Sequence, residues 1–162
     1  MIVIIMGVTG VGKSTVGQLL AQSTGWPLYD ADDYHSPANV EKMRAGIPLT
    51  DDDRWPWLDR LNALLRAADS KQESAILACS ALKQKYRDRL QKGLGNVRWV
   101  HLKGDIELIR ARLKQRRGHY MNPALLQSQF DALEPPGDAI VIDVSDSPAT
   151  LARRVLIALG KL

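Results

Sequence analysis

The sequence predicts an α/β protein in which five parallel strands form one sheet with helices on both faces. Two observations predict this fold. Five short apolar runs recur along the 162 residues, and segments with apolar residues at helical spacing separate them. Continuous apolar runs are typical of strands buried on both faces, and alternation of strands with helices favours a parallel sheet. The length fits a single domain that covers residues 1–162.

The elements follow from these patterns in chain order. We expect strands at 1–6, 26–29, 75–79, 97–102 and 139–144. We expect helices at 13–24, 36–46, 52–68, 81–92, 105–117 and 123–132, and a last helix with Ser147 as N-cap and Pro148 at its first position. Ligands bind at the carboxyl ends of parallel strands. One rim should therefore carry residues 7–14, 30–35, 80–87 and 145–148.

Composition narrows the possible partners and the compartment. The net charge is +4, with 22 basic and 18 acidic side chains, which favours anionic partners without requiring nucleic acid. The single cysteine, Cys79, excludes an internal disulfide and fits a reducing compartment. The apolar run at 1–6 is too short for a signal peptide, and no apolar stretch approaches the roughly 18 residues of a membrane span. We therefore expect a cytoplasmic protein without a membrane partner.

A phosphate-binding loop is the most specific motif. Residues 7–14 match G-x-x-x-x-G-K-[ST], between an expected strand and an expected helix. Glycines let the backbone N–H groups surround a phosphate, Lys13 reaches the β and γ phosphates, and Ser14 offers its hydroxyl to Mg²⁺. The alternative is a simple tight turn. The residues expected to bind a nucleoside triphosphate here are Gly7, Val8, Thr9, Gly10, Val11, Gly12, Lys13, Ser14 and Thr15. The fold class thereby narrows to a P-loop NTPase.

The P-loop alone does not identify the reaction. A GTPase would need N-K-x-D or T-K-x-D, and neither occurs. An ATPase of the motor type could use Asp143, which ends the last apolar run, as a carboxylate for Mg²⁺. Only one helix follows Asp143, so its position favours a core strand that ends near the nucleotide base.

A small-molecule kinase needs a carboxylate near the attacking hydroxyl, and Asp30 and Asp32 follow the second expected strand. We expect Asp30 to assist Mg²⁺ and Asp32 to orient the acceptor hydroxyl. The alternative is a solvated acidic turn, because aspartate is common in turns.

Such a kinase also needs cations and a lid that excludes water. Five cations and no acid occur within residues 110–117, followed by Gly118 as a candidate hinge. We expect Arg112 and Arg116 to grip the triphosphate and Arg116 to act in catalysis with Lys13 and Asp32. The alternative is an exposed basic helix face.

Beyond these motifs, the sequence resembles the gluconate kinase family over nearly its whole length. The resemblance is carried by Asp30-Ala31-Asp32, His35, Asn39, the block K-M-R-A-G-I-P-L-T-D-D-D-R-W-P-W-L at 42–58, Cys79–Lys83, Tyr86-Arg87, and the segments 118–121 and 125–134. It departs in Ser36, inserted between His35 and Pro37, and in Tyr120 where phenylalanine is usual.

This resemblance implies a nucleoside-monophosphate-kinase-like fold with a small lid at about 110–135. It also implies ATP with Mg²⁺, transfer to the terminal hydroxyl of D-gluconate to give 6-phosphogluconate, and a homodimer.

Gluconate is a carboxylate that carries a row of hydroxyls, so its site needs a cation and several hydrogen-bonding groups. Candidates for the carboxylate are Arg54, Lys83 and Arg87. Candidates for the hydroxyls are Asp32, His35, Asn39 and the run 51–53, although that run also suits the first turn of a helix. Trp55 and Trp57 could pack on the aliphatic side of the substrate or belong to the core.

Three other functions stay open. A shikimate kinase shares the P-loop and the D-x-D pattern, but the chain has no Gly-Gly pair. A nucleoside monophosphate kinase would be expected to carry D-G-x-P-R, which is absent. A nucleic-acid-binding ATPase would use the basic helices, and its binding would depend steeply on salt.

Overall fold

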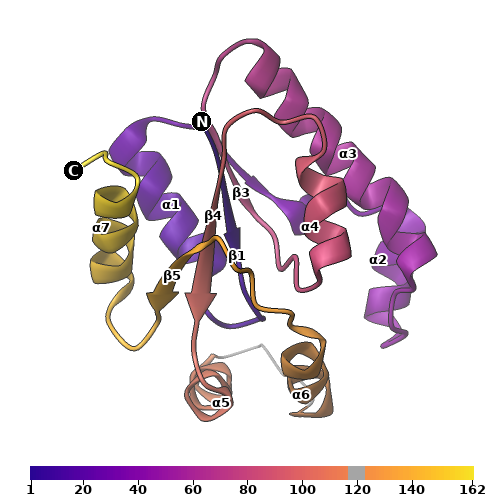
Figure 1. The fold of residues 1–162 in the computed structure, drawn as a ribbon. Helices are drawn as coiled ribbons and strands as arrows, with labels where there is room; N and C mark the ends of the chain where they lie inside the picture. Colours follow the sequence, from indigo (N-terminus) through magenta and orange to yellow (C-terminus); the bar gives the residue numbers. More distant parts are fainter. Residues whose placement is uncertain (117–122) are drawn as a thin grey trace.

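The structure of the protein is a computed structural model that describes residues 1–116 and 123–162. Five parallel strands form one sheet: β1 (Ile2–Met6), β2 (Leu28–Asp30), β3 (Ala75–Ala78), β4 (Val97–Lys103) and β5 (Ile140–Asp143). Their order is β2-β3-β1-β4-β5, so β1 lies at the centre (Figure 1). All five residues of β1 are buried. The predicted five-stranded parallel sheet is confirmed.

Seven α-helices and one 3₁₀ helix connect these strands in the described ranges. They are α1 (Lys13–Thr24), η1 (Ala31–Tyr34), α2 (Pro37–Arg44), α3 (Asp51–Ser70), α4 (Gln84–Gln91), α5 (Ile106–Gln115), α6 (Pro123–Ala132) and α7 (Pro148–Ala158). Helices α1 and α7 cover one face of the sheet, and α3 and α4 cover the other (Figure 1). Helices α5 and α6 contact each other beyond the carboxyl ends of the strands (Figure 1).

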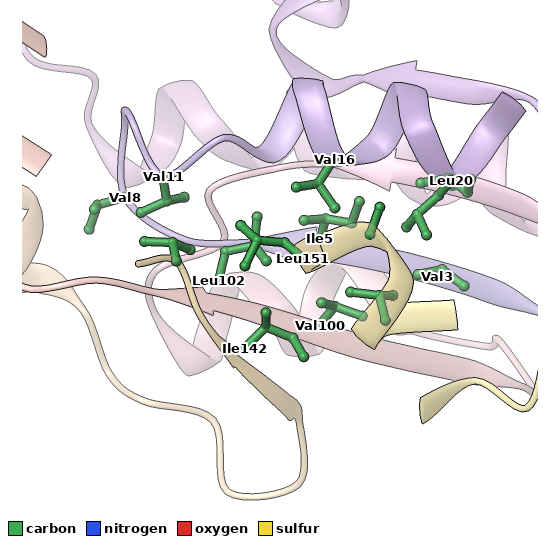
Figure 2. Packing of buried hydrophobic residues seen from close by; sticks show 14 of the residues in the cluster. Val3, Ile5, Val8, Val11, Val16, Leu20, Val100, Leu102, Ile142 and Leu151 are labelled. Atoms are coloured by element: carbon green, nitrogen blue, oxygen red, sulfur yellow. The ribbon is translucent and has the colours of Figure 1, made fainter. Parts of the chain in front are cut away.

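Two hydrophobic cores hold these layers together, and β1 supplies both because its side chains alternate between faces. Val3 and Ile5 pack in the core formed with α1 and α7, which Figure 2 shows together with Val16, Leu20 and Leu151. On the opposite face, Ile2, Ile4 and Met6 pack with Leu58, Leu61 and Leu65 of α3. Full burial of each such side chain stabilises the fold by about 1.5–3 kcal/mol. The cores thus hold the end of β1, where the glycine loop begins.

Local structure differs from the sequence prediction at two places near this rim. Helix α4 begins at Gln84 rather than at residue 81, because Ala81 has φ of 46° and Lys83 is extended as the N-cap residue. The 3₁₀ helix η1 was not predicted. It forms because the Asp30 side chain accepts a hydrogen bond from the Asp32 backbone N–H at 3.0 Å.

Two further predictions can be compared with the structure only within the described ranges. The candidate hinge Gly118 and the other residues of 117–122 lie outside them. Within them, no helix is long and apolar enough to cross a membrane.

Candidate active site

The glycine loop of residues 7–12 joins the carboxyl end of β1 to the N-terminus of α1. Gly10 and Gly12 have φ of 87° and 99°, values that strongly favour glycine. A Cβ at Gly10 would also lie 3.1 Å from side-chain atoms of Ile109 and Leu113, so α5 packs directly against the loop. The glycine conformations therefore set the shape of the loop, and α5, the helix that carries the basic run, packs against it.

Lys13 lies over this loop. Its Nζ donates to the backbone carbonyls of Gly7 at 2.9 Å and Val8 at 3.0 Å. Burial lowers the pKa of Lys13 from its usual value, and the neighbouring Asp30 and Asp32 carboxylates oppose that shift. The ammonium group thus lies where the loop would hold the β and γ phosphates of a nucleotide.

The loop contacts the acidic segment after β2 through Ser14, whose hydroxyl donates to Asp30 Oδ2 at 3.1 Å. The two residues predicted to serve Mg²⁺ are therefore side by side. The described residues contain no cluster of three or more His, Cys, Asp or Glu side chains that would hold a metal alone. Mg²⁺ in phosphate-transfer sites usually takes one or two protein oxygens together with phosphate and water. The Ser14–Asp30 pair fits that kind of ion.

Asp32 and His35 extend the site away from the loop. Asp32 lies on η1, and its pKa is raised by desolvation and by the neighbouring Asp30, while His35 and Lys13 act in the opposite direction. Burial lowers the pKa of His35, Asp32 opposes that shift, and Arg54 adds to it. These electrostatic couplings place Lys13, Asp32, His35 and Arg54 in one neighbourhood.

Arg54 reaches this neighbourhood from the first turn of α3. Its Nη1 donates to the Tyr86 hydroxyl at 3.1 Å, and its guanidinium carbon lies 5.2 Å from the centre of the Tyr86 ring. The Tyr86 hydroxyl in turn donates to Asp51 Oδ1 at 2.6 Å, and Lys85 forms an ion pair with Asp51. This network fixes Arg54 between α3 and α4, with a cation available to an acidic substrate.

The run 51–53 forms the first turn of α3, as one of its two readings predicted. Asp53 forms a capping box with Thr50 and an ion pair with Lys42 at 2.8 Å. Hydrogen bonds from Lys42 and from the Thr50 backbone lower the pKa of Asp53 to about 2. Asp51 and Asp53 therefore act first as structural acids that hold α2, α3 and α4 together.

His35, Asn39 and Trp57 form a second fixed group. The His35 ring stacks on Trp57 with a centroid distance of 4.1 Å and an angle of 17° between planes. Trp57 is buried and donates its indole N–H to the Ala31 carbonyl at 2.7 Å. Asn39 is buried with its Nδ2 beside His35 Nδ1 and the Asp53 carbonyl. Trp57 is thus a core residue, as the burial alternative predicted. Its contacts with Ala31 and His35 support residues 30–35, which we call the acceptor segment.

Arg87, predicted to meet the substrate carboxylate, is 2% exposed in this structure. Its guanidinium donates to the carbonyls of Ala81 at 2.8 Å and Glu134 at 2.7 Å, and to Gln84 Oε1 at 3.0 Å. Its Nε is buried without a partner among the described residues. Arg87 therefore joins the 81–84 loop to the end of α6, and the structure does not bring it together with Asp32 or His35. Lys83 is half-buried at the start of α4.

The two arginines expected to grip the triphosphate lie at the end of α5. Arg112 donates to the carbonyl of Val144, just after β5. Arg116 is exposed at the C-cap of α5, close enough for its charge to lower the pKa of Lys13. Arg116 is therefore near the loop, whereas Arg112 is directed to the neighbouring strand end.

One contact to the loop was missed by the sequence analysis. Gln129 of α6 accepts from the Thr9 backbone N–H at 2.8 Å and donates to Thr9 Oγ1 at 3.0 Å. The two residues are 120 positions apart, so no local pattern could reveal the contact. Gln129 lies within the 125–134 segment of the family resemblance, which was the only available signal.

The central strand, the glycine loop and the following helix define a P-loop protein. Asp143 ends β5, an edge strand that β4 separates from β1. Its carboxylate accepts hydrogen bonds from Ser145, which lower its pKa. A sequence model of the shikimate kinase family matches residues 9–136.

Similarity to individual known proteins identifies the family more narrowly than this sequence model does. The chain is 48% identical to a probable gluconokinase of Rattus norvegicus, over 98% of this chain and 97% of that protein. It is 43% identical to the thermosensitive gluconokinase of Escherichia coli K12, over 93% and 83% of the two chains. The crystal structure of a gluconokinase from Sinorhizobium meliloti matches with a TM-score of 0.88 at 39% identity, over 98% and 91% of the two chains. The chain belongs to the gluconokinase family.

Proposed function

We propose that this protein phosphorylates D-gluconate with ATP and forms 6-phospho-D-gluconate. Gluconokinase relatives that match nearly the whole chain support the substrate. The observation that carries the proposal is the 3.1 Å contact between Ser14 and Asp30. It joins the nucleotide loop to the segment that would hold the acceptor, so the two substrates would meet at one rim of the sheet.

In this proposal the loop and its cations hold the triphosphate. The backbone N–H groups of residues 10–15 and the ammonium of Lys13 bind the phosphates, and Arg112 and Arg116 approach from α5. Arg112 would exchange its contact with Val144 for phosphate oxygens. Mg²⁺, held by Ser14 and by Asp30, would neutralise charge on the phosphates.

Asp32 orients the terminal hydroxyl of gluconate toward the γ-phosphate and accepts its hydrogen. A carboxylate positioned at the attacking hydroxyl is suited to this role. The hydroxyl oxygen forms the new bond to phosphorus as the bond to ADP breaks. Positioning and charge stabilisation supply most of the acceleration in such transfers.

Arg54 is the best-placed cation for the gluconate carboxylate, because Tyr86 and Asp51 hold it at the same side as His35. His35 binds a hydroxyl, and Lys83 adds positive charge from the start of α4. Arg87 supports this side by fixing the 81–84 loop. The proposal also includes a cytoplasmic location, a homodimeric assembly and a single kinase domain with its lid at about residues 110–135. The activity does not depend on nucleic acid.

A coupled ADP-release assay with several acceptors tests this function. We expect turnover with D-gluconate and little with shikimate or nucleoside monophosphates. Added RNA or DNA should leave the rate without acceptor unchanged. ADP release that is fastest with shikimate, or that requires nucleic acid, would overturn the proposal.

A further inference from the structure

Asn39 is almost fully buried, at 5% exposure, and its amide lies between two fixed partners. Its Nδ2 is 3.0 Å from the backbone carbonyl oxygen of Asp53 and 3.3 Å from His35 Nδ1. A carbonyl oxygen can only accept a hydrogen bond, so the atom facing it must be the NH₂ group. The reversed amide would place two acceptor oxygens against each other. The Asp53 carbonyl therefore fixes the orientation of the Asn39 amide.

That orientation determines the protonation of His35. The NH₂ group carries two hydrogens and no lone pair that accepts, so the hydrogen not used by Asp53 is directed at His35 Nδ1. Nδ1 must then be the acceptor, and the proton of the neutral ring resides on Nε2. Protonation of Nδ1 would place an N–H group against the Asn39 NH₂ group.

The rest of the site fixes the position of the ring. Trp57 stacks on one face of His35, and the Trp57 indole is anchored to the Ala31 carbonyl. The charged groups that face His35 are Asp32 on η1 and Arg54 on α3. The ring plane, its rotation and its tautomer are thus all set by buried contacts from η1, α2 and α3.

We propose that Asn39 is a positioning residue that holds His35 as the neutral Nε2–H tautomer, so that His35 donates a hydrogen bond to an oxygen of the sugar acid. This inference rests on the proposed function and replaces a direct contact of Asn39 with substrate. In this tautomer His35 cannot act as a general base, since Nε2 already carries a proton and Nδ1 faces a donor. Asp32 is then the group that accepts the hydrogen of the attacking hydroxyl.

Nitrogen-15 NMR of the whole protein tests the tautomer without substrate. The chain has three histidines, and His35 is assigned by its missing signals in His35→Gln. We expect the wild-type ring to show a protonated Nε2 and an unprotonated Nδ1 at neutral pH. A protonated Nδ1 in the wild type would overturn the proposal, whatever the stability of any variant.

Two variants sharpen the NMR test. Asn39→Asp places an acceptor opposite Nδ1, so the pH midpoint of His35 should rise above its wild-type value. Ala38→Asp adds the same charge at the neighbouring exposed position of α2, without facing the ring, and should shift the midpoint less. Equal shifts in the two variants would contradict the direct contact.

Kinetics separate positioning from a general structural role. In Asn39→Leu, His35 is no longer held as the Nε2–H tautomer and loses its hydrogen bond to the substrate. Loss of that one neutral hydrogen bond should raise the gluconate KM by about 5- to 10-fold, with the ATP KM unchanged. His35→Ala should raise it at least as much, and the double variant should be no worse than His35→Ala alone. Additive increases would show that Asn39 acts independently of His35. The NMR result does not depend on which acceptor is phosphorylated, so this inference and the proposed function can fail separately.

Discussion

Trp57→Phe tests whether the core supports the acceptor segment. The indole N–H of Trp57 donates to the Ala31 carbonyl at 2.7 Å, and Ala31 is only 2% exposed. Phenylalanine keeps an aromatic ring but removes the donor, so a buried carbonyl loses its partner. An unsatisfied buried group costs about 1–3 kcal/mol, and the smaller ring adds the cost of a cavity. The free energy of unfolding should fall by at least about 1 kcal/mol by this reasoning.

Trp99→Phe is a matched control for the smaller ring. Trp57 and Trp99 are 8% and 7% exposed, and Trp99 also donates its indole N–H, to Gln91 Oε1 at 2.8 Å. Gln91 is only half-buried, so its amide can turn to water when the donor is lost. Urea unfolding should show a larger loss for Trp57→Phe, and only that variant should raise the gluconate KM. Equal losses of stability in the two variants would refute the assigned role of the Ala31 bond.

Three further predictions address charge at the site. Lys13→Ala should lower kcat by about 10²–10³-fold, the usual cost of removing one donor to a developing charge, while the fold survives; near-normal turnover would contradict its role. Asp32→Asn should lower kcat far more than ATP affinity, and an effect confined to the ATP KM would remove Asp32 from the acceptor side. Asp53 has a pKa of about 2 in the folded protein, against an ordinary 3.8. It therefore stabilises the fold above pH 4 and loses that effect as the pH falls toward 2. Asp53→Asn should flatten this part of the stability profile measured by urea unfolding, and an unchanged profile would contradict the ion pair with Lys42.

Local patterns were sufficient for the centre of the fold. The glycine loop and α1 occupy the residues that their motif and spacing indicated, because glycine conformations and helical periodicity are properties of the local sequence. The rim positions of Ser14 and Asp30 followed from the rule that ligands bind at the carboxyl ends of parallel strands. Their contact at 3.1 Å agrees with that expectation.

Tertiary contacts account for what the sequence could not indicate. Ala81 adopts a left-handed conformation while Arg87 binds its carbonyl, so α4 starts three residues later than its basic pattern suggested. The contacts of Arg87 with the carbonyls of Ala81 and Glu134 could not be predicted, because a backbone carbonyl carries no sequence signature. The Gln129–Thr9 contact joins residues 120 positions apart, and only folding brings them together.

The position of the transferred phosphoryl group tests the central claim most directly. The whole protein is incubated with ATP, Mg²⁺ and uniformly ¹³C-labelled D-gluconate, and the product is examined by ³¹P and ¹³C NMR. The account predicts a phosphate ester whose phosphorus couples to the terminal carbon of the acid, formed together with one ADP. Coupling to a carbon other than the terminal CH₂ and its direct neighbour, or ADP released without a phosphorylated acid, would contradict it.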